Sequence, residues 1–161
     1  MIDLDRLKIN LHSINSYIKD IHYGGCGIFA YWLGYYLTEY KIRNFKYIAY
    51  ARHEGIQEDI QKIKEHIEKS STLNELNDVH KTFFPHVVIE IKKEHFDNHG
   101  KAFFKNLSCD QIYYVELTGE ELKKFIDCEV GWNCLFDRKD IPRLKTLIKE
   151  AVQKSIKNNK E

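Results

Sequence analysis

The most reactive arrangement in the sequence is a cysteine enclosed by glycines, Gly24-Gly25-Cys26-Gly27. It stands directly before the most apolar segment of the chain, a hydrophobic stripe at helical period that runs to about Tyr40. A cysteine at the start of a helix lies at the positive end of the helix dipole, which stabilises the nucleophilic thiolate. The glycines would let a carbonyl approach the backbone, where the N–H of Cys26 could donate to an oxyanion. Cys26 is therefore our candidate nucleophile, and the alternative is a small apolar residue in a glycine-rich turn.

A nucleophilic thiol needs a base, and the chain has eight histidines. His86 differs from most of the others because it follows Pro85 and opens the β-branched run Val87-Val88-Ile89. This pattern places His86 at the beginning of a central strand, whereas charged neighbours favour an exposed surface for most other histidines. We therefore expect His86 to act as the base for Cys26.

The third candidate comes from the hairpin that follows His86. A tight turn at residues 91–93 precedes a short returning strand that ends at Asp97. With such a turn, His86 and Asp97 project from one face, either directly opposed or one step diagonal. Asp97 can therefore orient the imidazole and stabilise its protonated form. Asn98 and His99 could take that role if the register slipped by one residue.

Two motifs resemble the cysteine and histidine boxes of papain-like and transglutaminase-like cysteine enzymes, in particular small microbial and phage-type members. They are GGCGIFAYWL, at the predicted helix start, and HVVIEIKKEHFDNHG, across the hairpin. The resemblance implies a papain-like fold with Cys26 as nucleophile, His86 as base and Asp97 as orienting acid. Gly100 matches the glycine that closes the hairpin motif, and Trp132-Asn133 resembles a late motif of such proteins.

The chain departs from the papain pattern at the oxyanion hole. A papain-type enzyme has a glutamine a few residues before the cysteine, but the nearest upstream polar residues here are Asp20 and His22. Asn15 or Tyr17, earlier on the first predicted helix, are the candidates to supply this donor, and Asn98 is a further supporting candidate.

Hydrophobic periodicity predicts the helices and strands that must position these residues. We predict amphipathic helices over about the first twenty residues and around 56–67, the apolar helix at 26–40, and closing helices at 119–125 and from Asp140 onward. Strands are expected at 45–51, 83–91, 94–97 and 111–118. Helices, then an antiparallel sheet, then closing helices indicate an α+β fold with the cysteine-bearing helix packed on a small sheet. Without repeats or linkers, we expect one domain over 1–161.

Composition excludes several classes of function. Lys plus Arg number 25 and Asp plus Glu number 24, a net charge of +1 that does not favour nucleic acid or membrane surfaces as partners. No apolar stretch is long enough to span a membrane, and the first residues lack a signal peptide's apolar core, so we expect a cytoplasmic protein. The cysteines lack CxxC pairs, so free thiols are expected. We expect no cofactor and no metal.

The sequence therefore predicts a cysteine peptidase or amidase that cleaves an amide, isopeptide or thioester bond of a protein or peptide through an acyl-enzyme. An acyltransferase or transglutaminase-type enzyme would use the same residues. A catalytically silent papain-like module that binds a protein is a further alternative. A metal site made by Cys109, Cys128, Cys134 and a histidine is disfavoured because the spacings lack short ligand pairs. The sequence does not indicate an oligomeric state.

Overall fold

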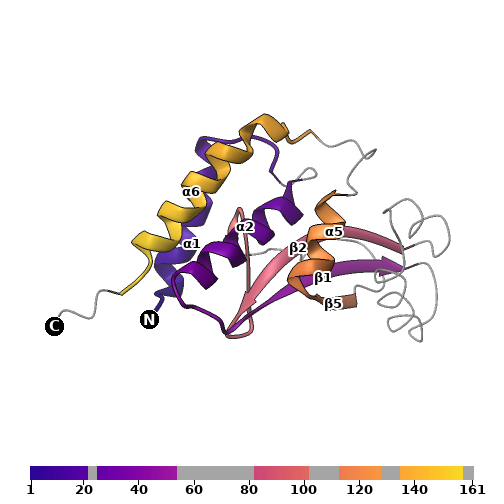
Figure 1. The fold of residues 1–161 in the computed structure, drawn as a ribbon, viewed down its shortest axis with the longest axis horizontal. Helices are drawn as coiled ribbons and strands as arrows, with labels where there is room; N and C mark the ends of the chain where they lie inside the picture. The colour runs from indigo at the N-terminus through magenta and orange to yellow at the C-terminus, as the bar shows by residue number, and fades with distance from the viewer. Residues whose placement is uncertain (22–24, 54–81, 102–112, 128–134, 158–161) are drawn as a thin grey trace.

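The computed structural model describes residues 1–21, 25–53, 82–101, 113–127 and 135–157. Within these ranges the fold is α+β, as expected, with helices gathered on one side of an antiparallel sheet (Figure 1). The expected helix around 56–67, Cys109, Cys128, Cys134 and Trp132-Asn133 all lie outside the described residues.

The first helix is shorter than its periodicity predicts. Helix α1 spans Leu4–Ser13 and is capped by Asp3, whose carboxylate accepts from the N–H groups of Asp5 and Arg6. A 3₁₀ turn, η1 (Ile14–Ser16), follows, and residues 17–21 are not helical. Its tighter hydrogen bond, from the N–H of Tyr17 to the carbonyl of Ile14, ends the helical run. The apolar positions that continue the periodicity are still buried, namely Ile14, Ile18 and Ile21.

Helix α2 (Cys26–Glu39) begins at the cysteine, as predicted, and is the central helix of the fold. Its buried face includes Phe29, Leu33 and Leu37, which join one hydrophobic core with residues of the sheet and of the outer helices. Figure 1 shows α2 between the sheet and the pair formed by α1 and α6. Burial on two sides explains why this segment is apolar over such a wide stripe.

The sheet has the order β4-β3-β2-β1-β5, and all of its neighbouring pairs are antiparallel. The strands are β1 (Phe45–His53), β2 (Thr82–Ile91), β3 (Glu94–Asp97), β4 (Gly100–Lys101) and β5 (Tyr113–Leu117). Strand β4 was not predicted, because two residues carry no alternation pattern. The helix-facing side of the sheet contributes Ala49, Val87, Ile89, Ile91 and Phe96 to the core.

The closing elements are helix α5 (Gly119–Asp127), a 3₁₀ turn η3 (Arg138–Asp140) and helix α6 (Ile141–Lys154). Helix α6 begins after Asp140, as expected, and has Pro142 in its first turn, where the missing N–H costs no helical hydrogen bond. An antiparallel bridge between Ile2 and Ile156 joins the two ends of the described chain. The described residues contain no helix that is both long and apolar enough to span a bilayer.

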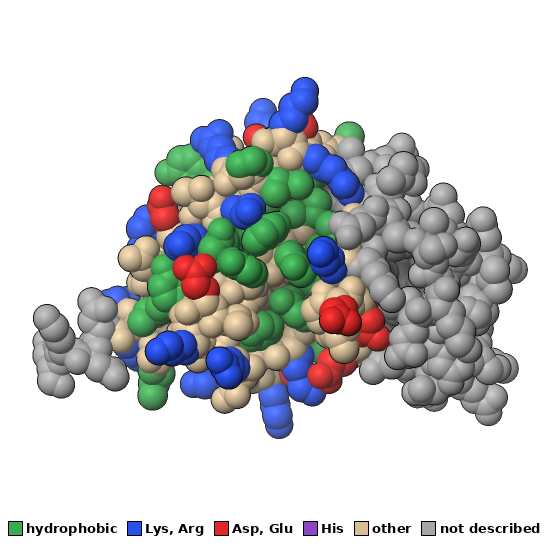
Figure 2. Space-filling view, in the orientation of Figure 1, with side chains coloured by type: hydrophobic (Ala, Val, Ile, Leu, Met, Phe, Trp, Pro, Cys, Tyr) green, Lys and Arg blue, Asp and Glu red, His purple; other side chains and the backbone are tan. Residues whose placement is uncertain are grey.

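Hydrophobic side chains gather in the middle of the helix-bearing face, with Lys and Arg side chains around them (Figure 2). Two lysines of α6 cover aromatic rings of α2. The Nζ of Lys145 lies 3.9 Å from the centre of the Trp32 ring, and that of Lys149 lies 5.7 Å from the Tyr36 ring. These cation–π contacts help fix α6 against α2 and so hold the cysteine-bearing helix in place.

Candidate functional site

The cysteine lies at the first residue of α2. Cys26 is a half-buried free thiol, and Gly25 is the residue before the helix. Gly25 has no side chain and therefore cannot itself cap the first N–H groups of the helix. This leaves the positive end of the helix dipole and the N–H of Cys26 beside the thiol.

Gly25 has a packing role that the sequence did not indicate. A Cβ at this position would lie 2.6 Å from the carbonyl oxygen of Ile21 and 2.9 Å from the Phe136 ring. The space that a side chain would need is occupied by the Ile21 backbone and the Phe136 ring. Gly25 allows the backbone before Cys26 to pack tightly against these two residues, which fixes where α2 begins.

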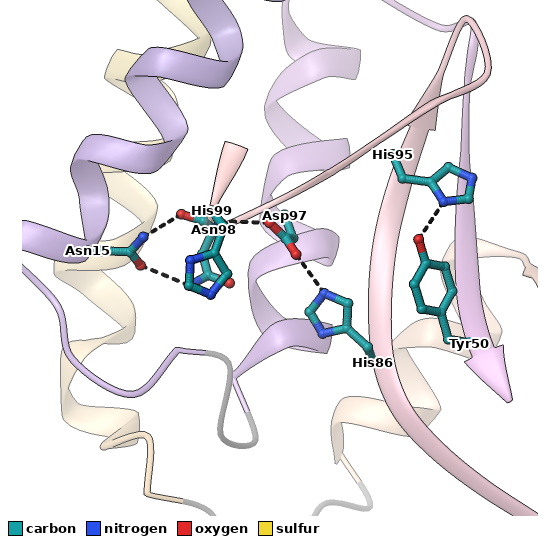
Figure 3. Close-up of polar contacts among 7 residues, drawn as sticks. All are labelled: Asn15, Tyr50, His86, His95, Asp97, Asn98 and His99. Carbon is teal, nitrogen blue, oxygen red and sulfur yellow. Dashed lines mark hydrogen bonds and ion pairs between the residues drawn. The ribbon is translucent and has the colours of Figure 1, made fainter. Parts of the chain in front are cut away.

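His86 and Asp97 form a buried pair on neighbouring strands. The Nε2 of His86 lies 2.8 Å from Oδ2 of Asp97, and each residue is only 3 % exposed (Figure 3). The β2–β3 ladder ends with Ile89 opposite Phe96. Continuing this register by one residue places Val88 opposite Asp97 and His86 one step diagonally away, which is one of the two arrangements that the hairpin turn predicts.

The histidine also interacts with the cysteine. Burial opposes a charge on the imidazole, but hydrogen bonds with the side chains of Asp97 and Cys26 outweigh it and raise the pKa of His86 to about 9. Because Nε2 faces Asp97, Nδ1 is the nitrogen left to face the thiol. The structure thus brings together all three residues that the sequence singled out.

Asp97 is held as a carboxylate. Burial favours its neutral form, but the hydrogen bond with His86 and that from the N–H of His99 lower the pKa of Asp97 below its ordinary value. The His99 N–H donates to Oδ1 at 2.7 Å, while Oδ2 faces His86. Each oxygen therefore has its own partner, and the carboxylate cannot rotate without losing one of them.

The supporting candidates lie as follows. Asn15, in η1, donates its Nδ2 to the carbonyl oxygen of Asn98 at 2.7 Å, and its Oδ1 accepts from Nδ2 of Asn98 at 2.8 Å (Figure 3). Tyr17 is 55 % exposed, and the guanidinium of Arg143 lies 5.8 Å from its ring. Neither set of contacts involves Cys26. The side-chain amide of Asn15, offered as an oxyanion donor, is thus engaged with Asn98 instead.

A second series of hydrogen-bonded side chains, which the sequence did not indicate, lies beside His86. Tyr50 is paired with His86 across the β1–β2 ladder, and the two ring centres lie 5.9 Å apart. The Tyr50 hydroxyl is hydrogen bonded to Nδ1 of His95, and Nε2 of His95 lies 3.1 Å from Glu90. The Glu90–His95 contact could have been found from the hairpin register, in which these residues are opposite. No local signal in the sequence places Tyr50 beside them.

A cavity of about 550 Å³ lies elsewhere, between α2, Tyr47 of β1 and the first residues of α5. It is lined by Tyr31, Gly34, Tyr35 and Tyr47, among others, and by none of Cys26, His86 and Asp97. The cavity and the cysteine site are therefore different places. In the described part of the chain, no group of three or more His, Cys, Asp or Glu residues is arranged to hold a metal ion.

Comparison with protein-family models, with curated proteins and with solved structures finds no match to this chain.

Proposed function

We propose that this chain is a thiol-dependent hydrolase with a papain-like fold, in which Cys26 attacks an amide, isopeptide or thioester carbonyl. The observation that carries the proposal is the buried pair of His86 and Asp97, 2.8 Å apart, with the Cys26 thiol hydrogen bonded to the same imidazole. A thiol, an imidazole and a carboxylate linked in this order are the parts that covalent catalysis by a cysteine requires.

The papain-like fold is supported by how the elements carry these groups. Cys26 begins a central helix, and His86 and Asp97 lie on neighbouring strands of the antiparallel sheet on which that helix packs. The groups also occur in the chain order cysteine, histidine, acid. The motifs around Cys26 and His86 resemble those of papain-like enzymes, which agrees with this arrangement.

The proposed reaction uses the two nitrogens of His86 for different tasks. In the resting pair Nδ1 holds the proton of the thiol, and the Cys26 thiolate forms an S–C bond with the substrate carbonyl carbon. The protonated Nδ1 then gives its proton to the leaving nitrogen or sulfur as the scissile bond breaks. Water next attacks the acyl-enzyme carbonyl and gives a proton back to Nδ1. As the S–C bond breaks, the acid product leaves, and the thiolate paired with the imidazolium is restored.

Asp97 and the helix start support these steps. The Asp97 carboxylate keeps Nε2 protonated, so that Nδ1 is the nitrogen that exchanges the proton, and it stabilises the imidazolium. The N–H of Cys26 can donate to the oxyanion that develops on the carbonyl oxygen.

The proposal is tested by brief reaction with substoichiometric iodoacetamide at pH 6, followed by mass spectrometry of each cysteine. An ordinary thiol is almost wholly protonated at this pH, whereas a thiolate paired with an imidazolium reacts readily. We expect Cys26 to be labelled well ahead of Cys109, Cys128 and Cys134, and the His86→Ala variant to lose this lead. A matched control is His12→Ala, which removes an exposed histidine of α1 and should leave the lead unchanged. Equal labelling of all four cysteines would show that the thiol is not activated.

A further inference from the structure

The position of Asp97 depends on the turn that follows it. Its Oδ1 accepts from the backbone N–H of His99 at 2.7 Å, and its Oδ2 lies 2.8 Å from Nε2 of His86. Residues 98 and 99 form the turn between β3 and β4. Any displacement of this turn therefore moves the carboxylate relative to the imidazole.

The sheet alone holds this turn weakly. Strand β4 has only two residues, pairs with β3 alone and forms the edge of the sheet. The turn is instead packed against the N-terminal helix. At Gly100, whose φ is +89°, a Cβ would lie 2.5 Å from the carbonyl oxygen of Lys8 in α1.

Two hydrogen bonds between Asn15 and Asn98 join the turn to the N-terminal segment. Asn15 donates Nδ2 to the Asn98 carbonyl at 2.7 Å and accepts from the Asn98 amide at 2.8 Å. Asn98 is only 1 % exposed, so water cannot readily replace these partners. Figure 3 shows Asn15 on one side of residues 97–99 and His86 on the other. A primary amide at position 15 supplies both the donor and the acceptor that this geometry needs.

We propose that Asn15 and Asn98 form a clamp that positions Asp97 against His86. This inference deepens the proposed function and rests on it for its catalytic meaning. The segment that carries Asn15 also leads, through Ile18 and Ile21, to Gly25 and Cys26, and both isoleucines are buried in the core. The segment from Asn15 to Cys26 thus has two tasks. It carries the nucleophile at its C-terminal end, and through Asn15 it holds the turn that follows Asp97.

The clamp is tested in a Cys26→Ala background, so that no thiol titrates together with the imidazole. The pKa and tautomer of His86 are measured by ¹H–¹⁵N NMR of the imidazole nitrogens in the parent and in two variants. Asn15→Ala removes both hydrogen bonds and should lower the His86 pKa by about 1 or more, with loss of the protected Nε2–H signal. Asn98→Ala keeps the bond from Asn15 to the carbonyl and should produce a smaller fall.

The matched control is Asn10→Ala. Asn10 is a part-buried asparagine of α1 whose Nδ2 donates to Oγ of Ser155 at 2.9 Å, so its loss weakens the contact with α6 without touching the turn. Thermal unfolding is recorded for every variant. We expect Asn10→Ala to lower the melting temperature but to leave the His86 pKa and tautomer at the parent values.

The clamp is overturned if Asn15→Ala and Asn98→Ala leave the His86 pKa unchanged, or if Asn10→Ala lowers it as much as they do. Should Asn15→Ala not fold, Asn98→Ala carries the same test alone. Failure of the proposed function gives a different result. In that case Cys26 of the native chain shows no lead in alkylation, whereas the NMR measurement, made without Cys26, still reports whether the clamp holds Asp97.

Discussion

The imidazole of His86 and the carboxylate of Asp97 face each other across 2.8 Å at a site where both side chains are almost fully buried. A buried charge is costly unless it is paired, and here each partner supplies the charge that the other needs. The pair is therefore stable as an imidazolium and a carboxylate. Loss of the charge on either partner leaves the other charge buried and unpaired, which should lower the stability of the fold.

The protonated His86 should make stability depend on pH in the neutral to alkaline range. Its pKa is raised to about 9 from 6.5, so the folded chain holds a proton that the unfolded chain releases. The resulting stabilisation, on the order of 3 kcal/mol, is complete below pH 6.5 and is lost as the pH rises through 9. Urea unfolding at several pH values measures it. In a His86→Gln variant this decline should be absent, and an equal decline there would contradict the prediction.

Asp97→Asn should release the imidazole from its charged partner. Without the carboxylate, burial opposes protonation and only the interaction with Cys26 still favours it, so the His86 pKa measured by NMR should fall well below 9. We expect the variant to be less stable by about 2 kcal/mol at pH 6. The native carboxylate, whose pKa is lowered, contributes stability above pH 3.8 that is lost as the pH falls through its folded value. The variant should lack this acidic decline. A His86 pKa that stays near 9 would show that Asp97 is not its main partner.

Local patterns predicted the parts of the site that lie close together in the chain. The two-residue turn at Lys92-Lys93, where both φ angles are positive, determines which residues of the hairpin share a face. This is why spacing alone predicted that His86 and Asp97 project from one face, either opposed or one step diagonal, and the register of the structure selects the diagonal arrangement. The start of α2 at Cys26 was also predictable, because glycines precede an apolar stripe of helical period.

Features that depend on distant segments could not be predicted. Helix α1 ends at Ser13, and Asn15 contacts Asn98, although apolar periodicity continues to Ile21. Periodicity reports burial, which Ile18 and Ile21 do retain, but it does not report backbone conformation. The position of Tyr50 opposite His86 depends on a pairing of β1 with β2 that no short turn determines.

Gly100→Ala should disturb both the turn and the site. A side chain at this positive φ is strained, and its Cβ would meet the Lys8 carbonyl at 2.5 Å. We expect a loss of about 2 kcal/mol in the free energy of unfolding, together with a lower His86 pKa, because the turn that holds Asp97 is pushed from α1. Gly119→Ala is the control, since the nearest atom to its Cβ would lie 3.7 Å away, an ordinary contact. Equal effects of the two substitutions would argue against a specific contact at Gly100.

Tyr50→Phe should separate the hydroxyl of Tyr50 from its ring. The variant keeps the ring beside His86 but removes the hydroxyl bound to Nδ1 of His95. We expect the free energy of unfolding to fall by about 1 kcal/mol, the usual size for one hydrogen bond, while Cys26 keeps its lead in alkylation. Tyr114→Phe is a matched control, because this ring also packs on Tyr50 but is 61 % exposed. If Tyr50→Phe abolished the alkylation of Cys26 without unfolding the chain, the hydroxyl itself would belong to the proton-transfer path, and the assignment of that path to Cys26, His86 and Asp97 alone would be wrong.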